Sequence, residues 1–158
     1  MSGKIEVGDK APVFKLYSQE GNETDIGEIL GNRPLVLFFY PKNNTTVCTK
    51  EACEFRNSYK ELAKINGAEV IGISSDSTES HKNFASEHNL PYTLLSDPDG
   101  AVRKLYGVPK TLGLLPGRVT YVIDRSGIVR SIFSSQLDYR GHVEEALTTL
   151  RAIEQGNN

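Results

Sequence analysis

Two short apolar runs, separated by an amphipathic segment, constrain this fold more than any other feature of the chain. Residues 35–40 read LVLFFY and residues 69–74 read EVIGIS, and such runs are typical of strands buried on both faces of a sheet. Between them, apolar side chains recur every three or four positions, as on one face of a helix: Cys48, Ala52, Phe55, Tyr59 and Leu62. The order strand, helix, strand predicts two parallel strands joined by a right-handed crossover.

The rest of the chain adds further elements with the same periodicities. We expect a second helix from Asp76 through His88, because Asp76 and Glu79 have the spacing of a capping box. The other expected elements are a strand at 92–95, a short helix ending at Tyr106, strands at 119–123 and 128–133 joined by a hairpin turn, and a helix at 139–153. This order predicts a thioredoxin-like α/β fold, with a central mixed β-sheet flanked by helices. We expect residues 1–158 to form a single domain, with 1–34 as a short N-terminal extension and 35–154 as the core.

Composition argues against several classes of partner. The chain has 158 residues, enough for one domain. Its 18 Lys and Arg residues against 20 Asp and Glu give a net charge of −2, so no basic field would attract nucleic acid or an acidic membrane. The longest apolar run, at 35–40, is far shorter than the roughly 20 residues of a membrane span. Only 2 cysteines and a start without the apolar region of a secretory signal predict a reducing setting, and we expect a cytoplasmic protein.

Cys48 lies where the first expected strand gives way to the first helix, and in open α/β sheets this edge is where sites form. If Thr45 or Thr46 is the N-cap, the thiol lies among backbone N–H groups that have no intrahelical acceptor, at the positive end of the helix dipole. These surroundings favour the thiolate, which is the nucleophilic form of cysteine. Because Cys48 also lies in the apolar stripe, a small buried thiol without reactivity is the alternative.

Cys53 is a second thiol on the same expected helix. On an ideal helix, residues five apart have Cα atoms separated by roughly 8.6 Å, which exceeds the limit of about 7 Å for a disulfide. A bridge would therefore require this turn of the helix to unwind. If both thiols react, Cys48 becomes a sulfenic acid, Cys53 attacks it, and a thiol reductant must reset the disulfide. The alternative is two unrelated cysteines, one in the stripe and one on the opposite side.

Other chemistries fit the pattern less well. The cysteines lack the C-x-x-C spacing of dithiol oxidoreductases and the second ligand pair of a structural zinc site. His81 and His88 share a helix face but are separated by about 10.5 Å, too far to hold one ion, and we interpret them as solvated or boundary histidines. The glycines at 107, 113 and 117 lack phosphate-loop spacing and indicate a flexible connection. We expect no metal and no organic cofactor.

Arg118 is the remaining candidate for the site. It stands at the start of the 119–123 strand, from which its side chain could reach the adjoining strand edge of a mixed sheet. A guanidinium carries a permanent charge and five donors, so it could stabilise a thiolate and a polarised peroxide oxygen. Sequence spacing alone leaves an ordinary surface arginine as the alternative.

These residues together resemble the peroxiredoxins, and within them the bacterioferritin comigratory protein or peroxiredoxin Q group. Pro41, Thr45 and Cys48 match the family motif P-x-x-x-T-x-x-C. Residues 48–56, CTKEACEFR, are similar to the signature of the group, including its second cysteine, and residues 117–124, GRVTYVID, are similar to its arginine-bearing strand. The likeness extends over nearly the whole chain.

The resemblance implies a role for five residues. Cys48 would be the peroxidatic cysteine and Cys53 the resolving cysteine. Thr45 would hydrogen-bond the thiolate and the peroxide oxygen, Arg118 would supply positive charge, and Pro41 would shield the sulfur from water.

One dipeptide departs from the pattern of the group, because Thr46-Val47 stands where Pro-Gly usually precedes the peroxidatic cysteine. Proline pre-sets φ for the first helical position and glycine permits unusual dihedral angles. The replacement therefore affects the shape and the opening rate of this turn.

The activity implied by the resemblance is that of an antioxidant thiol peroxidase. It would reduce hydrogen peroxide and organic hydroperoxides through a Cys48 sulfenate and a Cys48–Cys53 disulfide, as a monomer recycled by thioredoxin or a similar thiol reductant. A redox sensor that uses the same cysteine pair to switch a binding surface is the alternative. A general dithiol oxidoreductase is disfavoured by the cysteine spacing, and catalytic turnover of peroxide separates the enzyme from the sensor.

Overall fold

The computed structural model describes residues 4–111 and 115–156 of the chain. The strands are β1 (Lys15–Ser18), β2 (Glu23–Asp25), β3 (Leu35–Phe39), β4 (Glu69–Ser74), β5 (Thr93–Ser96), β6 (Lys110–Thr111), β7 (Leu115–Pro116), β8 (Val119–Ile123) and β9 (Val129–Ser134). The helices are α1 (Thr46–Lys64), α2 (Thr78–Glu87), α3 (Ala101–Leu105) and α4 (Tyr139–Gln155), with a 3-10 turn η1 (Ile26–Glu28). Within these residues, no helix is both long and apolar enough to cross a bilayer.

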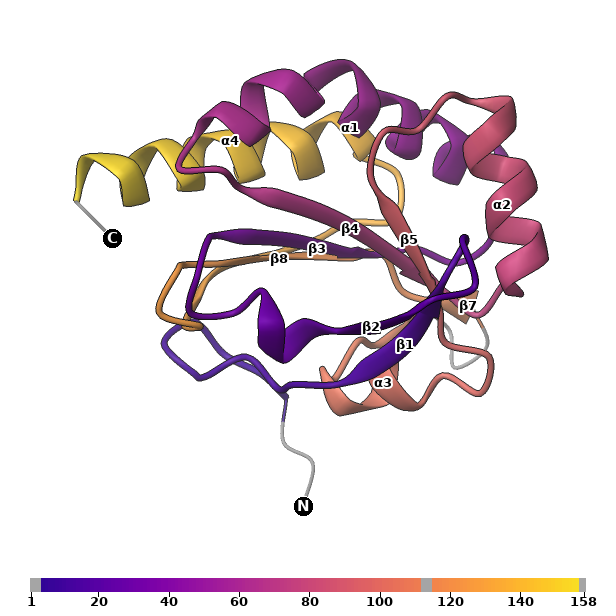
Figure 1. The fold of residues 1–158 in the computed structure, drawn as a ribbon, viewed down its shortest axis with the longest axis horizontal. Coiled ribbons are helices and arrows are strands. Elements are labelled where there is room, and N and C mark those ends of the chain that lie inside the picture. The colour runs from indigo at the N-terminus through magenta and orange to yellow at the C-terminus, as the bar shows by residue number, and fades with distance from the viewer. Residues whose placement is uncertain (1–3, 112–114, 157–158) are drawn as a thin grey trace.

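The central sheet has seven strands in the order β2-β1-β5-β4-β3-β8-β9. β3 runs parallel to β4, and β4 to β5, whereas β8 and β9 form an antiparallel hairpin beside β3. The helices α1 and α4 lie side by side over one face of this sheet and α3 lies on the opposite side (Figure 1). The predicted strand, helix, strand unit is β3-α1-β4, and the predicted mixed sheet flanked by helices is confirmed.

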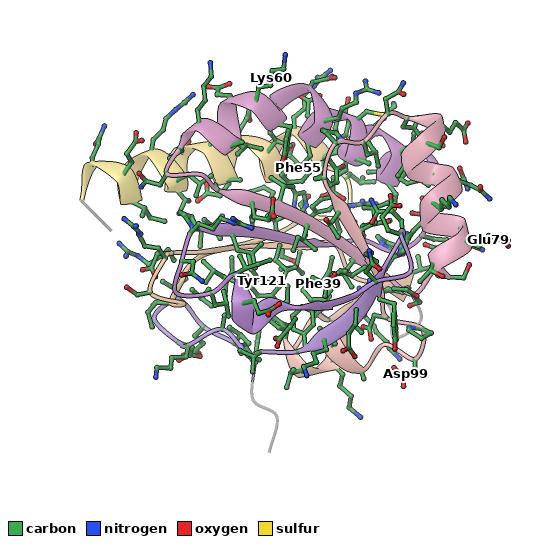
Figure 2. All side chains as sticks on the ribbon, in the orientation of Figure 1. Phe39, Phe55, Lys60, Glu79, Asp99 and Tyr121 are labelled. Atoms are coloured by element: carbon green, nitrogen blue, oxygen red, sulfur yellow. The ribbon has the colours of Figure 1, made fainter. Side chains whose placement is uncertain are left out.

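β3 has an uninterrupted apolar sequence because it faces two cores. Val36 and Phe38 belong to the core under α1 and α4, and Leu37 and Phe39 belong to the core on the other face. All four residues are fully buried, which stabilises the fold by roughly 1.5–3 kcal/mol for each side chain. The Phe38 ring stacks on Phe55 of α1 with centroids 4.4 Å apart. Figure 2 shows Phe55 among the helices and Phe39 on the far side of the strands.

The segment 1–34, which we expected to be an extension outside the core, contributes two strands to the sheet. β1 pairs antiparallel with β5, and β2 pairs antiparallel with β1 at the edge of the sheet. Both strands are short, and Ser18 at the end of β1 is the one buried residue in the two of them. Their sequence therefore lacks the apolar period that marks β3 and β4.

The start of α2 differs from the predicted capping box. Ser77, rather than Asp76, is the N-cap, and its side chain accepts a hydrogen bond from the N–H of Ser80 at 3.1 Å. The Asp76 carboxylate instead accepts hydrogen bonds from the Ser74 hydroxyl at 2.5 Å and from the backbone N–H of Asn43 at 2.8 Å. A partner 33 positions away along the chain outweighs the local cap.

The connection expected to be flexible is partly ordered. β6 and β7 pair antiparallel within it. A Cβ added at Gly117 would lie 2.4 Å from the carbonyl oxygen of Pro109, so this glycine is required for close packing of two backbone segments. Gly107 has a positive φ of 73°, and Gly113 lies outside the described residues.

Candidate active site

Cys48 is positioned by the end of β3 and the start of α1. The N-cap of α1 is Thr45, in an extended conformation with φ −99° and ψ 156°. The first helical hydrogen bond runs from the N–H of Thr49 to the carbonyl of Thr45 at 2.9 Å. Cys48 is therefore the third residue of the helix, in the turn whose N–H groups lack intrahelical acceptors. The residue is 2% exposed, and its thiol is free.

Arg118 brings a positive charge onto this thiol. Its Nη2 donates a hydrogen bond to the Cys48 Sγ at 3.2 Å, and its Nε donates to the carbonyl of Gln136 at 2.9 Å. The strand register explains the position, because Val119 of β8 pairs with Phe39 at the end of β3. Arg118 is 4% exposed, so the alternative of an ordinary surface arginine is excluded.

Glu51 is the second partner of Arg118. Its Oε1 accepts a hydrogen bond from the Arg118 Nη1 at 2.7 Å, and the residue is fully buried. Burial raises the pKa of Glu51 to about 7, against the opposing effect of the Arg118 charge. Burial disfavours the charge of Arg118, but Glu51 and Cys48 outweigh it and hold the pKa of Arg118 above its ordinary value. The arginine is therefore a permanent cation shared by a carboxylate and a sulfur.

His142 of α4 lies behind this ion pair. Its Nδ1 is 3.5 Å from the Glu51 Oε2, an oxygen that has no hydrogen-bond partner among the described residues. The Nε2–H of His142 donates to the carbonyl of Ser135 at 2.8 Å, and Nδ1 accepts from the Thr120 hydroxyl at 2.7 Å. Burial lowers the pKa of His142 to about 4. The imidazole is therefore neutral at physiological pH and does not compete with Arg118 for Glu51.

A cavity of about 480 Å³ opens onto the Cys48 thiol. Four of the residues singled out from the sequence line it: Pro41, Thr45, Cys48 and Arg118. Its mouth also carries Leu115 and Leu137, which are 59% and 76% exposed. A small molecule in this cavity contacts the sulfur, one charged donor and an apolar rim.

The Thr45 hydroxyl lines the cavity but does not contact the thiol in this structure. Its Oγ1 donates a hydrogen bond to the carbonyl of Lys42 at 2.8 Å. Since the hydroxyl hydrogen is used there, Oγ1 faces an incoming ligand as an acceptor. The predicted hydrogen bond from Thr45 to the thiolate is therefore not formed here, and its role toward a peroxide stays a prediction.

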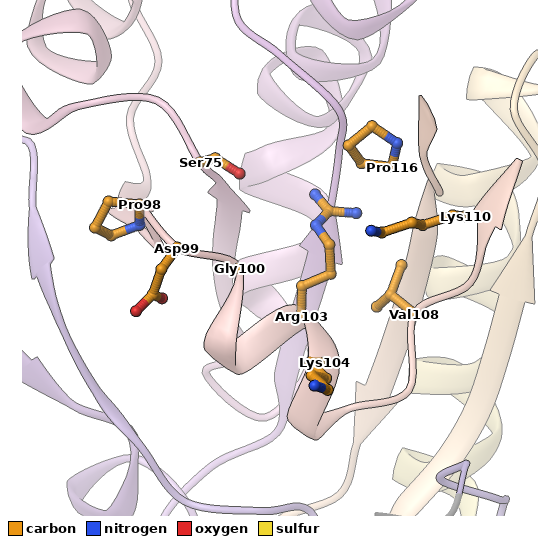
Figure 3. Close-up of a pocket in the computed structure, with 9 residues that line it drawn as sticks. All are labelled: Ser75, Pro98, Asp99, Gly100, Arg103, Lys104, Val108, Lys110 and Pro116. Atoms are coloured by element: carbon orange, nitrogen blue, oxygen red, sulfur yellow. The ribbon is translucent and has the colours of Figure 1, made fainter. Parts of the chain in front are cut away.

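A second buried arginine, Arg103 of α3, fastens the two chain segments that form the cavity. Its Nη2 donates to the carbonyl of Tyr40 at 2.7 Å and its Nη1 to the carbonyl of Gly117 at 2.8 Å. Arg103 thus ties the end of β3, which precedes Pro41, to the residue before Arg118. It lines a separate cavity of about 540 Å³ together with Pro116 and Lys110 (Figure 3).

The loop that carries Pro41 is fixed by a buried polar network. The Tyr40 hydroxyl donates to the Asn43 side chain at 2.6 Å, and the Asn43 amide donates to the His81 Nδ1 at 3.0 Å. His81 in turn donates from Nε2 to the carbonyl of Leu95 at 3.0 Å and is fully buried. The interpretation of His81 as a solvated or boundary residue is therefore wrong. No group of three or more potential metal ligands occurs among the described residues.

Cys53 lies outside the Cys48 cavity. It is half-buried and its thiol is free, and α1 is continuous through both cysteines. Residues five apart on a helix point about 140° away from each other. A disulfide between the two thiols therefore still requires the first turns of α1 to unwind, as the sequence spacing predicted.

Sequence reasoning missed Glu51, His142 and Arg103. Glu51 has a local signal, because it stands three residues after Cys48 and so shares the buried face of the helix. A charged residue on that face needs a buried partner, and Arg118 was available. His142 and Arg103 have no such local signal, because their partners are backbone and side-chain atoms far away in the sequence.

The chain is similar to proteins of one family over most of its length. The model of the AhpC/TSA family matches residues 7–132. The chain is 46% identical over 151 residues to a chloroplastic peroxiredoxin Q of Sedum lineare, which covers 95% of this chain and 80% of the relative. It is 49% identical over 150 residues to a chloroplastic peroxiredoxin Q of Arabidopsis thaliana, which covers 94% of this chain and 68% of the relative.

Solved structures show the same likeness. The peroxidoxin BcpB of Mycobacterium tuberculosis superposes with a TM-score of 0.86 at 40% identity, over 94% of this chain and 98% of the other. A bacterioferritin comigratory protein of Xanthomonas campestris, described for its alkyl peroxide reduction activity, superposes with a TM-score of 0.82 at 28% identity, over 92% and 99%. The thioredoxin-like fold class and the resemblance to the peroxiredoxin Q group are thereby confirmed.

The expected cytoplasmic location is contradicted by the plant peroxiredoxin Q relatives, which are chloroplastic proteins by name. The prediction rested on cysteine usage and on the lack of a secretory signal. Scarce cysteines distinguish a reducing compartment from an oxidising one, but they do not distinguish one reducing compartment from another. The prediction of location was therefore wrong.

Proposed function

We propose that Cys48 carries the peroxidase reaction of this chain, which belongs to the AhpC/TSA family and, with its peroxiredoxin Q relatives, is a thiol-dependent peroxidase. The observation that carries the assignment is the hydrogen bond of 3.2 Å from the Arg118 guanidinium to the Cys48 sulfur. A buried sulfur in contact with a permanent cation and a helix N-terminus is favoured as the thiolate. The thiolate is the attacking form.

The first step transfers one oxygen atom to sulfur. The thiolate attacks the terminal oxygen of the hydroperoxide, so that an S–O bond forms while the O–O bond breaks. The leaving oxygen carries away the bonding electron pair and takes a proton to become water or an alcohol, and Cys48 becomes a sulfenic acid. The guanidinium of Arg118 stabilises the charge that moves onto the leaving oxygen.

Thr45 and Pro41 position the peroxide in this proposal. The Thr45 Oγ1, whose hydrogen is held by the Lys42 carbonyl, accepts the O–H of the peroxide and so orients the terminal oxygen toward sulfur. Pro41 lines the same cavity and offers no N–H group, so it excludes water without competing for the peroxide.

The rim of the cavity supports alkyl hydroperoxides as substrates besides hydrogen peroxide. Leu115 and Leu137 expose apolar surface next to the thiol, and an alkyl chain packed there would leave water. Hydrogen peroxide has no group that could use this surface. We expect the rim to lower KM for an organic hydroperoxide and to leave KM for hydrogen peroxide unchanged.

The second step regenerates the enzyme through Cys53. The Cys53 thiolate attacks the sulfenic sulfur of Cys48, the S–O bond breaks, and hydroxide leaves as water after it takes a proton. Because α1 holds the thiols apart, its first turns must unwind before the bond forms. Thioredoxin or a similar dithiol then reduces the disulfide through a mixed disulfide. We expect the chain to complete this cycle as a monomer, since both cysteines are in one helix.

Mass spectrometry after one equivalent of peroxide tests the assignment. Wild type should gain an intramolecular disulfide, Cys53→Ser should gain one oxygen on Cys48, and Cys48→Ser should stay reduced. Oxidation of Cys53 in the Cys48→Ser protein, at the wild-type rate, would remove Cys48 from the role of nucleophile.

A further inference from the structure

Cys53 contacts a histidine that the peroxidase site does not use. The Cys53 Sγ lies 3.8 Å from the Nδ1 of His88, within the range of a sulfur–nitrogen hydrogen bond. His88 is the residue that caps the C-terminus of α2, whereas Cys53 belongs to α1. Both residues are half-buried, so the pair is partly shielded from water and still accessible to it.

Two backbone hydrogen bonds and one ring contact hold His88 in this position. Its backbone N–H donates to the carbonyl of Phe84 at 3.1 Å, and its ring packs edge-on against the Phe84 ring with centroids 4.9 Å apart. Its carbonyl accepts a hydrogen bond from the Nη1 of Arg56 at 2.8 Å. Since Arg56 is on α1 close to Cys53, this bond fixes the two helices to each other at the point where the sulfur and the imidazole meet.

The surroundings allow a proton to pass from the thiol to the imidazole. The His88 Nδ1, which lies 3.8 Å from the Cys53 sulfur, can accept a proton. The charged residues near Cys53 along α1 include Lys50, Glu54 and Arg56, and the Arg56 guanidinium is held at the His88 carbonyl. The nearby Tyr92 donates its hydroxyl to the carbonyl of Ala52 at 2.7 Å, and burial keeps its pKa well above the ordinary value, so it is a neutral neighbour. Glu87, which precedes His88, is exposed.

We propose that His88 is the general base of the resolving step, taking the proton of Cys53 while α1 is still folded. This inference rests on the proposed function. The proton moves from the Cys53 sulfur to the His88 Nδ1, which leaves a thiolate and an imidazolium. When α1 unwinds, the thiolate forms the S–S bond with Cys48 and the sulfenic S–O bond breaks. The imidazolium returns its proton, through solvent, to the departing hydroxide, so that water is released and His88 is neutral again.

Alkylation of Cys53 in the Cys48→Ser protein measures this proton transfer without the redox steps. In His88→Asn, an amide group can occupy the place of Nδ1 but cannot take a proton. We expect iodoacetamide to label Cys53 roughly tenfold more slowly at pH 7 in the His88→Asn protein. The difference should vanish above about pH 9, where an ordinary thiol ionises unaided.

The matched control is Lys82→Asn, an exposed position on the same helix, which should leave the rate unchanged. Equal rates with and without His88 would overturn the proposal, as would an equal slowing at every pH, which would indicate altered access only. Should His88→Asn fold poorly, His88→Gln provides the same test.

Rapid quenching of the protein with both cysteines separates this inference from the proposed function. After one equivalent of hydrogen peroxide, His88→Asn should form the Cys48 sulfenic acid at the wild-type rate and convert it to the disulfide roughly tenfold more slowly at pH 7. Wild-type conversion in His88→Asn would overturn the role of His88 alone. Absence of Cys48 oxidation in the wild-type protein would instead overturn the proposed function.

Discussion

The two cysteines of α1 lie in contrasting surroundings, although they are separated by little more than one turn. Cys48 is 2% exposed and accepts a hydrogen bond from Arg118, a group that stays charged at every physiological pH. Cys53 is half-buried, and its Sγ lies 3.8 Å from the Nδ1 of His88, an imidazole that can accept a proton. A permanently charged partner fits the nucleophilic role that we propose for Cys48. A partner that can accept a proton fits the resolving role that we propose for Cys53.

Loss of either sulfur gives the largest expected effect and separates the two thiols by role. Cys48→Ser should lower peroxide consumption by more than about 10³-fold, because a serine hydroxyl is a far weaker nucleophile at neutral pH. Cys53→Ser should consume one equivalent at the wild-type rate and then stop when thioredoxin is the reductant. Peroxide consumption coupled to thioredoxin, followed over many turnovers, measures both results. Continued turnover of Cys53→Ser would mean that another thiol resolves the sulfenic acid.

Removal of the Arg118 charge should slow the oxidation of Cys48 and leave the reactivity of Cys53 unchanged. Arg118→Ala takes away the donor to Cys48, and loss of one such donor slows a reaction by roughly 10²–10³-fold. Stopped-flow oxidation of Cys48 by hydrogen peroxide measures this loss, and alkylation of Cys53 serves as the internal control. Because Arg118→Ala also leaves Glu51 buried without its partner, the double variant with Glu51→Gln should recover stability without recovering the rate. Full recovery of the rate would assign Arg118 a purely structural role.

Glu51 and His142, behind Arg118, should make opposite contributions to stability as the pH falls. The pKa of Glu51 is raised from 4.5 to about 7, so between these values the folded state holds a proton that the unfolded state releases, and lower pH stabilises the fold. The pKa of His142 is lowered from 6.5 to about 4, so in that window the unfolded state takes up the proton, and lower pH destabilises the fold. In the wild type the two contributions largely cancel between about pH 4.5 and 6.5.

Single variants should show separately how Glu51 and His142 make the unfolding free energy depend on pH. Relative to wild type, His142→Gln should gain up to about 1.4 kcal/mol of unfolding free energy per pH unit as the pH falls through this window, and Glu51→Gln should lose a similar amount. Urea unfolding at a series of pH values measures both. Parallel curves for the two variants and the wild type would show that neither group titrates as its burial requires.

The smallest expected effect concerns Val47, in the first turn of α1, which must unwind before the two thiols can bond. Val47 stands where peroxiredoxin Q proteins usually have glycine, and glycine lowers helix stability by roughly 0.3–0.5 kcal/mol relative to valine. Val47→Gly should therefore speed disulfide formation by up to about twofold, while oxidation of Cys48 stays unchanged. Rapid-quench mass spectrometry at pH 8 resolves the two steps. An unchanged rate of disulfide formation would show that opening of this turn is not limiting.

The sequence predicts those parts of the molecule whose causes are local. The two faces of β3, the apolar stripe of α1 and the turn before β9 each follow from side-chain period or turn chemistry within a dozen residues, and all occur as expected. The position of Cys48 in the first turn of α1 also follows, because it depends only on where the helix begins.

The remaining features depend on partners far away in the sequence. The role of Asp76 was misjudged because its carboxylate binds the backbone of Asn43 instead of capping α2. The burial of Arg118 follows from the register of β8 against β3, which no local pattern specifies. The pairing of Cys53 with His88 requires α1 and α2 to be docked, and two separate helices in a sequence carry no signal of that docking.

Oxidation of Cys48 by hydrogen peroxide at pH 7, compared in the Cys53→Ser protein and in the double variant with Arg118→Ala, measures whether the sulfur held by the guanidinium is the nucleophile. We predict a single added oxygen on Cys48 of the Cys53→Ser protein, trapped with dimedone, at a rate that Arg118→Ala lowers by roughly 10²–10³-fold. A Cys48 sulfur that peroxide does not oxidise, or an equal rate without Arg118, would contradict the assignment of Cys48 and Arg118 to this step.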